Sequence, residues 1–127
     1  MNPLRALLAR VRRRPLRVFH DEAYRLPLSG AESGPSGLET RRADDALHYL
    51  LQQHAISFED IVHPEPANYE DLARVHSPQY LDSLHDANEL ARIFSVDPSD
   101  VYVDELLRSV RLGVGGTVAA ARHALGG

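Results

Sequence analysis

Two long stretches of the chain place apolar residues at helical spacing. The first runs from Leu38 to His54, and the second, which is longer, runs from Val103 to Leu125. The inward positions expected in the first stretch are Ala43, Ala46, Leu47, Leu50, Leu51 and His54. Those expected in the second stretch are Leu107, Val110, Val114, Val118, Ala121 and Leu125. Steps of three and four residues are typical of amphipathic helices, so each stretch is predicted to be a helix with one buried face.

Two shorter apolar segments predict strands. Leu16–Phe19 ends at the polar pair His20 and Asp21, and Asp60–Val62 precedes a proline-rich turn. Short apolar strands that alternate with helical stretches are typical of α/β domains. We therefore expect an α/β fold with a short parallel sheet of two strands and several flanking helices. His20 and Asp21 fit a charge pair or a ligand pair, but hydrogen bonding at the strand end is the favoured interpretation.

A tight corner between two helices is predicted at residues 76–78. Helical spacing covers roughly 69–75 and 78–94, and a proline disfavours helical backbone in the residue before it. Ser77 can then cap the second helix, with Pro78 at its first position. The expected inward face is Leu72, Val75, Tyr80, Leu81 and Leu84. His76 is expected to be packed and bonded to backbone rather than to act as a ligand.

Three glycines interrupt the last predicted helix. Gly113, Gly115 and Gly116 each cost roughly 1 kcal/mol against alanine in a helix interior. Such a cost suggests that another segment of backbone approaches the helix closely at these positions. The alternative is a strand over 110–114 followed by a phosphate-binding turn at 113–117. Its spacing matches neither of the common glycine-rich phosphate motifs.

Composition adds limits to this picture. A chain of 127 residues with 43% hydrophobic and 25% charged residues suits one soluble domain. No run of 18 apolar residues is present, so no membrane-spanning helix is expected. The chain has no cysteine and can form neither a disulfide nor a thiolate metal site. A cytoplasmic location is the default expectation.

Charge is distributed unevenly along the chain. Residues 1–17 contain six arginines and no acid, and they are predicted to be a basic extension. Residues 18–127 contain eight arginines against eighteen acids. Binding to nucleic acid needs clustered basic side chains, so neither nucleic acid nor a membrane is an expected partner of the domain.

One motif resembles a known family. The pattern L-A-x-V-H-S-x-x-Y-L-x-x-L at 72–84 follows V-x-P-x-P-A-x-x-E-D-L at 62–72, and G-G-T-V-A-A-A occurs at 115–121. Together they resemble the amino-terminal region of the histone deacetylase superfamily, in particular its bacterial and class IV-like members, from about Val18 onward. The resemblance implies part of a three-layer arginase/deacetylase-like fold. It also implies a zinc-dependent hydrolase acting on acetyl-lysine or similar acylated amines.

The resemblance assigns few site residues to this chain. The family holds zinc with an Asp-x-His pair and a further Asp, beside a His-His dyad and a Tyr, and the sequence contains neither a His-His pair nor an Asp-x-His. No catalytic residue or metal ligand is therefore assigned. Arg42 matches an arginine near the internal channel of many members. Asp97 is the nearest match to an acidic residue of the substrate rim, with Asp100 or Asp104 as alternatives, and the loop 27–37 would form another part of that rim.

These observations lead to two hypotheses. The first is the front part of a deacetylase-family protein, which supplies scaffold and rim loops, is inactive alone, and has the missing carboxyl-terminal portion as a partner. The second is a non-enzymatic α/β module that binds a partner through the faces that further strands would cover.

Overall fold

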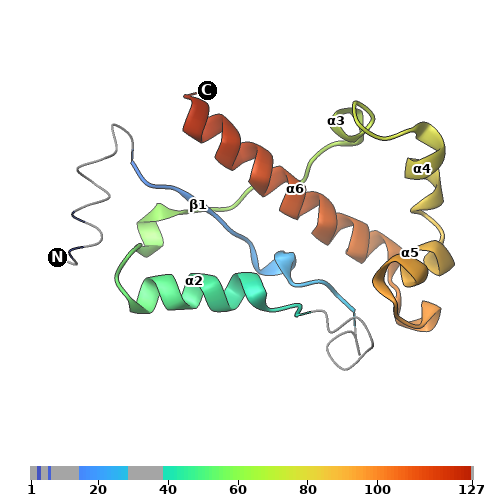
Figure 1. The fold of residues 1–127 in the computed structure, drawn as a ribbon, viewed down its shortest axis with the longest axis horizontal. Helices are drawn as coiled ribbons and strands as arrows, with labels where there is room; N and C mark the ends of the chain where they lie inside the picture. Colours follow the sequence, from blue (N-terminus) through green and yellow to red (C-terminus); the bar gives the residue numbers. More distant parts are fainter. Residues whose placement is uncertain (1–2, 4–5, 7–14, 29–38, 127) are drawn as a thin grey trace.

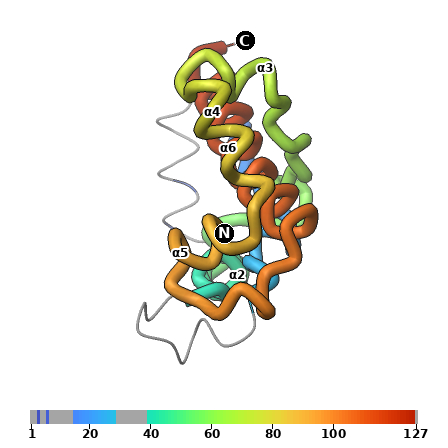
Figure 2. The backbone as a smooth tube through the Cα atoms, turned by 90° about the vertical axis from the view of Figure 1, so that its right-hand side faces the viewer, coloured from blue at the N-terminus to red at the C-terminus, as the bar shows by residue number. Residues whose placement is uncertain are grey.

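A computed structural model describes residues 15–28 and 39–126, together with the isolated positions 3 and 6. The long helix α6 (Val103–Leu125) crosses the molecule diagonally, with α2 (Arg42–Gln52) on one side (Figure 1). On the other side lie α3 (Tyr69–Leu72) and α4 (Pro78–Ser83), and α5 (Ala87–Phe94) lies near the amino-terminal end of α6. In the turned view, α4 and α5 lie in front of α6 (Figure 2). The predicted loop 27–37 and the basic extension 1–17 fall mostly outside the described residues.

The two predicted strands pair in parallel, although both are shorter than expected. β1 (Val18–Phe19) lies beside β2 (Ile61–Val62), with Val18 opposite Ile61 and Phe19 opposite Val62. Asp60 belongs instead to a single 3-10 turn, η3 (Phe58–Asp60), where its carboxylate accepts hydrogen bonds from the amide and hydroxyl of Ser57. The described part of the chain is thus helix-rich, with two parallel strands joined through α2.

Helix α2 is shorter than predicted, and fewer of its residues are buried than expected. It ends at Gln52, and His54 follows with a left-handed φ of 53°. Leu47, Leu50 and Leu51 are half-buried, as expected for an inward face. The same prediction is wrong for Ala43, Ala46 and His54, which are exposed. In the described part of the chain, the inward face of α2 is therefore limited to these partly buried leucines.

The predicted corner at 76–78 is confirmed, but one helix beyond it becomes two. Ser77 accepts a hydrogen bond from the amide of Tyr80 at 3.2 Å and starts α4 (Pro78–Ser83). Asp86 then accepts from the amide of Asn88 and starts α5 (Ala87–Phe94), so a single helix over 78–94 is wrong. This second cap was the sequence signal for the break.

The expected inward face before and after this corner is only partly buried. Leu72, Leu81 and Leu84 are half-buried, whereas Val75 is 78% exposed and Tyr80 is 42% exposed. Val75 escapes burial because α3 (Tyr69–Leu72) ends three residues before it. The inward assignment is therefore wrong for Val75 and Tyr80.

Helix α6 has the predicted bounds but buries a different face. It runs without a break through 110–117, which contradicts the strand and phosphate-binding turn considered as an alternative. Its buried residues are Leu106, Leu107, Ser109, Leu112, Gly115 and Gly116. Of the predicted stripe only Leu107 is buried, while Val110, Val114, Val118 and Leu125 are exposed. The stripe of Val110, Val114 and Val118, called the valine stripe below, is therefore only partly covered.

The core lies where the first half of α6 meets α5. Its buried members are Leu28, Leu90, Ala91, Val101, Leu106 and Leu107. An isolated antiparallel bridge between Leu28 and Val101 ties the segment after η1 (Glu22–Tyr24) to η4 (Pro98–Asp100) at the start of α6. This core holds the amino-terminal end of α6. Further along, α6 contacts β1 and η1.

Candidate functional site

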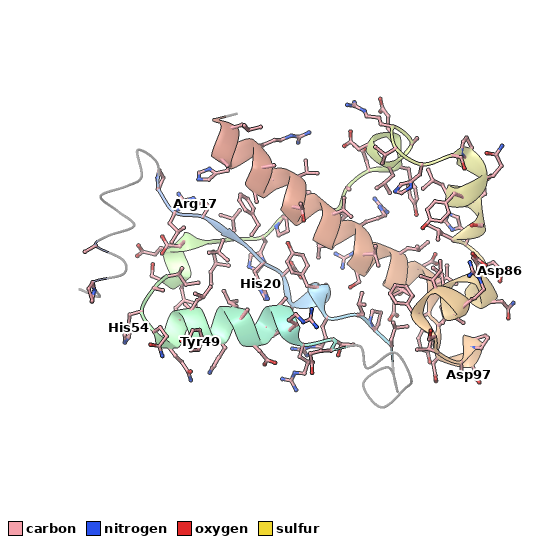
Figure 3. All side chains as sticks on the ribbon, in the orientation of Figure 1. Arg17, His20, Tyr49, His54, Asp86 and Asp97 are labelled. Carbon is pink, nitrogen blue, oxygen red and sulfur yellow. The ribbon has the colours of Figure 1, made fainter. Side chains whose placement is uncertain are left out.

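A polar cluster lies where β1 ends and α2 begins. His20 is buried, and its Nε2 is 3.2 Å from Oδ1 of Asp44 (Figure 3). The guanidinium of Arg25 donates to Oδ2 of Asp44 through Nε at 2.9 Å and through a terminal nitrogen at 2.5 Å. The carboxylate of Asp44 on α2 therefore bonds both His20, at the end of β1, and Arg25, which follows it in the chain.

The electrostatics of this cluster favour an ionised Asp44. Burial raises the pKa of Asp44, but the hydrogen bonds and charge of Arg25, followed by those of His20, outweigh burial and lower that pKa below its usual value. The same contact raises the pKa of Arg25, first through its hydrogen bond to Asp44 and then through that residue's charge. Asp44 and Arg25 therefore form an ion pair in which each group supports the ionised form of the other.

Asp21 and Tyr24 complete the hydrogen bonding at the strand end. Asp21 accepts from the amide of Ala23 at 2.9 Å, and its other oxygen is 3.3 Å from Nδ1 of His63. The hydroxyl of Tyr24 donates to the carbonyl of Phe19 at 3.3 Å, and its pKa is raised by burial and then by the charge of Asp21. The interpretation of His20 and Asp21 as strand-end hydrogen-bonding residues is confirmed.

The polar cluster does not fit a zinc ion. Within the described residues, no three His, Asp or Glu side chains come together as a set of metal ligands. Asp44, whose carboxylate is bonded to His20, is also bonded by the cationic guanidinium of Arg25. A divalent cation at that point would be opposed by the adjacent positive charge.

The glycines of α6 form a second, backbone-lined feature. A Cβ added at Gly115 would collide with the carbonyl oxygen of Glu65 and lie 3.0 Å from the amide nitrogen of Ala67. One added at Gly116 would collide with the hydroxyl of Tyr24. The predicted close approach of another backbone segment is thus confirmed at Gly115, whereas at Gly116 the close neighbour is the side chain of Tyr24. The prediction is wrong at Gly113, where an added Cβ would meet nothing within 4 Å.

Close approach allows the segment after β2 to bond directly to α6. The amide of Ala67 donates to the carbonyl of Arg111 at 2.9 Å, and Nε of Arg111 returns a bond to the carbonyl of Ala67 at 2.7 Å. The guanidinium of Arg111 also lies over the ring of Tyr69, 4.5 Å from its centroid. This reciprocal contact docks the long helix on the loop that leads to α3.

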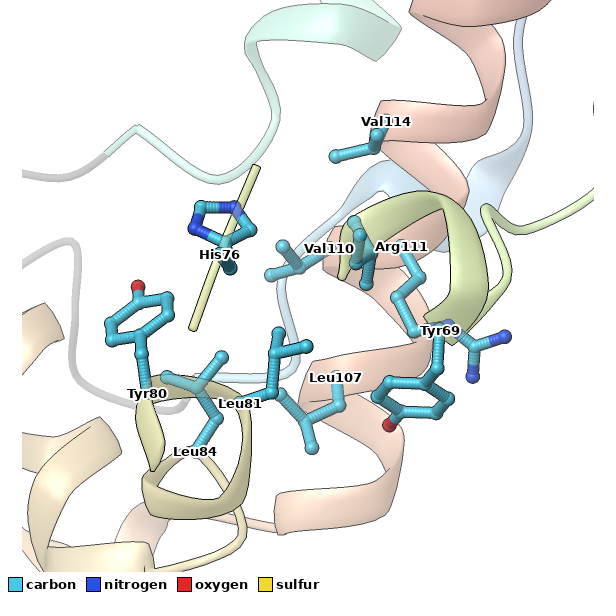
Figure 4. Close-up of a pocket in the computed structure, with 10 residues that line it drawn as sticks. Tyr69, His76, Tyr80, Leu81, Leu84, Leu107, Val110, Arg111 and Val114 are labelled. Atoms are coloured by element: carbon cyan, nitrogen blue, oxygen red, sulfur yellow. The ribbon is translucent and has the colours of Figure 1, made fainter. Parts of the chain in front are cut away.

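An apolar groove lies between α6 and the α3–α4 corner (Figure 4). Its volume is about 120 Å³, and its lining residues are Tyr69, Leu72, His76, Tyr80, Leu81, Leu84, Leu107, Val110, Arg111 and Val114. His76 is exposed at its rim, with its ring 5.1 Å from that of Tyr80 and its amide bonded to the carbonyl of Leu72. The expected backbone bond of His76 is present, but the residue is not buried. Sequence reasoning missed this groove, although the valine stripe on α6 marked one wall.

The two residues assigned by resemblance lie on different elements. Arg42 is the exposed first residue of α2. Asp97 is exposed and starts η4, where it accepts hydrogen bonds from the hydroxyl and amide of Ser99, which lower its pKa. Asp100 ends the same turn, and Asp104 lies exposed in the first turn of α6. The three acids therefore share one corner.

Comparison with known proteins identifies the family. The sequence model of the histone deacetylase domain matches residues 37–127, which is most of the chain. This chain belongs to the histone deacetylase family. The match begins later than Val18, where the resemblance was expected to start. Searches of the curated proteins and of the solved structures found no match. In the described part of the chain, no helix is long and apolar enough to cross a membrane.

Proposed function

We propose that residues 18–127 form the opening part of a three-layer arginase/deacetylase-like domain in a zinc-dependent amide hydrolase. The substrate class is an acylated amine such as acetyl-lysine. The family match over 37–127 supports the family-level activity. The observation that carries the structural part is the docking of the Gly115–Gly116 face of α6 on the segment 65–67. That docking places a parallel β1–β2 pair beside a long helix, as the start of a layered α/β domain requires.

In this proposal the chain contributes scaffold and rim rather than chemistry. Arg42 is the candidate for the internal channel, and Asp97 is the candidate that holds substrate at the rim. A carboxylate with a lowered pKa, such as that of Asp97, stays ionised at neutral pH and can accept hydrogen bonds from a substrate backbone. Zinc, when bound in the family, activates a water molecule for attack on the amide. The described residues of this chain offer no ligand set for it.

The test compares the chain alone with the chain coexpressed with a polypeptide that carries the zinc ligands. Purified chain should show no hydrolysis of an acetyl-lysine peptide with added zinc. Sequencing the transcript through codon 127 should reveal a reading frame, continuous or neighbouring, that encodes a His-His pair and an Asp-x-His motif. Coexpression of that polypeptide should produce zinc-dependent hydrolysis, and a matched version without the dyad should not. Hydrolysis by the chain alone, or no such frame, would overturn the proposal.

Within the complemented enzyme, two variants test the assigned residues. Asp97→Asn should raise KM for peptide substrates because a charged acceptor at the rim is lost, whereas Arg42→Ala should lower kcat. Asp45→Asn, at an exposed position on α2, is the control and should leave KM unchanged. A rise in KM with Asp100→Asn but not with Asp97→Asn would move the rim assignment to Asp100, and equal effects of Asp97→Asn and Asp45→Asn would remove it from Asp97.

A second function is favoured by the groove between α6 and the α3–α4 corner. An apolar groove of about 120 Å³, flanked by exposed valines, suits a partner-binding module. The two functions differ in their test, because a binding module would bind a partner without gaining hydrolysis.

A further inference from the structure

Within the described residues, strand β1 has a neighbouring strand on one edge only. The amide of His20, which follows β1, donates to the carbonyl of Val62 on β2 at 3.0 Å. Successive residues of a strand turn their backbone groups to opposite edges, so the amide and carbonyl of Phe19 point away from β2. The hydroxyl of Tyr24 bonds that carbonyl, and no described residue accepts a hydrogen bond from the Phe19 amide. The outer edge of β1 therefore presents an unpaired backbone donor.

The two helices beside β1 cover opposite faces of the sheet. Adjacent residues of a strand point to opposite faces. His20 bonds to Asp44 on α2 at 3.2 Å, whereas the ring of Phe19 contacts that of His123 on α6, with centroids 6.3 Å apart. Figure 1 accordingly shows β1 between α2 and α6.

The path of the chain then determines the edge at which a third strand joins. Helix α2 connects β1 to β2 over one face, and α6 follows β2 over the other face. Crossover connections between parallel strands are right-handed in about 98% of cases. Two right-handed crossovers over opposite faces run in opposite directions along a sheet. Because β1 already occupies the position beside β2 in the second direction, a strand that follows α6 joins the outer edge of β1.

The carboxyl-terminal end of α6 lies at the start of β1. Nε2 of His123 is 3.0 Å from the carbonyl oxygen of Pro15, which precedes β1 by three residues. Gly126 then ends the helix with a left-handed φ of 94°, which is a common way for a helix to end. Loops from a helix to a strand commonly have about two to six residues. A strand that begins here is therefore placed to run parallel to β1.

We propose that the outer edge of β1 is the docking surface for a parallel strand of the polypeptide that carries the zinc ligands. The incoming strand accepts a hydrogen bond from the amide of Phe19 and donates one to its carbonyl. β1 then becomes an interior strand, between β2 and the new strand. The identity of the partner rests on the proposed function, whereas the choice of edge rests on the geometry of this chain.

Amide hydrogen exchange of the full chain, alone and coexpressed with that polypeptide, gives the first test. The Phe19 amide should exchange at least about tenfold more slowly in the coexpressed form, because a bond between strands protects it. The His20 amide, already bonded to Val62, is the reference and should change little. The amide of His63 faces the outer edge of β2 and should gain no protection.

The outcomes separate the docking surface from the hydrolase function. Protection of His63 in place of Phe19 would move the strand to β2 and overturn the proposal. Hydrolysis without protection of Phe19 would also overturn it, while leaving the proposed function intact. Protection of Phe19 without hydrolysis would support the docking surface and remove the function. Protection of Phe19 in the chain alone that rises with concentration would assign the edge to a second copy of the chain and overturn the proposal.

An extended chain tests the edge without the second polypeptide. We would add after Gly127 a Gly/Ser loop of about four residues and the strand Thr-Val-Thr-Val-Thr. This extension should slow exchange of the Phe19 amide, because it begins beside the start of β1. A matched extension with proline in place of each valine cannot pair and should leave exchange unchanged. Equal exchange at Phe19 in the two extended chains would overturn the proposal.

Discussion

The two faces of α6 show how one helix can be closed on one side and open on the other. On the closed face, Gly115 and Gly116 bring the helix against Glu65 and Tyr24 with no room for a side chain. On the open face, Val110, Val114 and Val118 carry the larger apolar side chains and remain partly exposed. At the two glycines the contact is made by backbone and hydroxyl groups, and Leu112 on the same face is 2% exposed. Val110 and Val114 instead line the groove towards the α3–α4 corner and are only partly covered.

On α6, a polar residue is more buried than the valines. Ser109 is buried on the closed face, and its hydroxyl donates to the carbonyl of Ala23. The valines are more apolar but more exposed. Stability of the isolated chain should therefore respond strongly to small changes on the closed face and weakly to changes on the open face.

The largest expected effect is that of Gly115→Ala. The added methyl group would collide with the carbonyl of Glu65, and that backbone is held by the bonds between Ala67 and Arg111. We expect a loss of about 3 kcal/mol in the free energy of unfolding, measured by urea denaturation. A loss below about 0.5 kcal/mol would show that the closed face is not tightly packed.

Ser109→Ala should have the next largest effect. The change removes a buried hydroxyl that donates to the carbonyl of Ala23, and that carbonyl would lose a partner. The expected loss is about 2 kcal/mol in the same urea experiment. Thr117→Ala, on the exposed side of the same helix, is the matched control and should change stability little. Equal losses would contradict the difference between the two faces.

Acid should weaken the contact that Asp44 on α2 makes with His20 and Arg25. The pKa of Asp44 is lowered in the folded state, so its carboxylate stabilises the fold above the unfolded pKa of about 3.9. This contribution is lost as pH falls through the lower, folded pKa. Asp44→Asn should therefore flatten the dependence of unfolding free energy on pH below about pH 4. Asp45→Asn, on the same turn of α2 but outside the hydrogen bonds to His20 and Arg25, is the control for the substitution, and identical acid curves for the two variants would contradict this role of Asp44.

The smallest effect is expected at Gly113, and its sign is opposite. Nothing lies within 4 Å of an added Cβ there, so Gly113→Ala should improve helix stability without a collision. The expected gain is about 0.5 to 1 kcal/mol in the free energy of unfolding, measured by thermal unfolding. A loss at Gly113 as large as that at Gly115 would erase the distinction between the faces.

Local chemistry in the sequence predicted much of this fold. The bounds of α6 and the cap at Ser77 depend on residues within a few positions of one another, and both were confirmed. The close approach at Gly115 was also confirmed, because a glycine inside a helix indicates that another segment packs there, although the sequence does not show that this segment is 65–67. Burial of Val114 was predicted wrongly, because helical spacing defines a face without showing whether a neighbour covers it. The break before α5 was missed because Asp86 was not recognised as a cap.

The candidate site was less accessible from the sequence. The polar ends of His20 and Asp21 could be assigned to hydrogen bonding, but nothing local indicates that His20 meets Asp44, which lies 24 residues further on and on another element. The groove between α6 and the α3–α4 corner likewise depends on tertiary packing, because its two walls come from residues 69–84 and 107–114. Arg42 and Asp97 rest on resemblance and await the kinetic comparison described above.

The contact between Ala67 and Arg111 has a consequence for hydrogen exchange. Ala67 lies in the irregular segment between β2 and α3, where amides usually exchange quickly with solvent. Its amide is instead bonded to the carbonyl of Arg111, in the middle of the longest helix. Deuterium should therefore enter at Ala67 only when α6 itself opens or separates from the loop. A single amide in a loop would then report whether α6 stays docked on this segment.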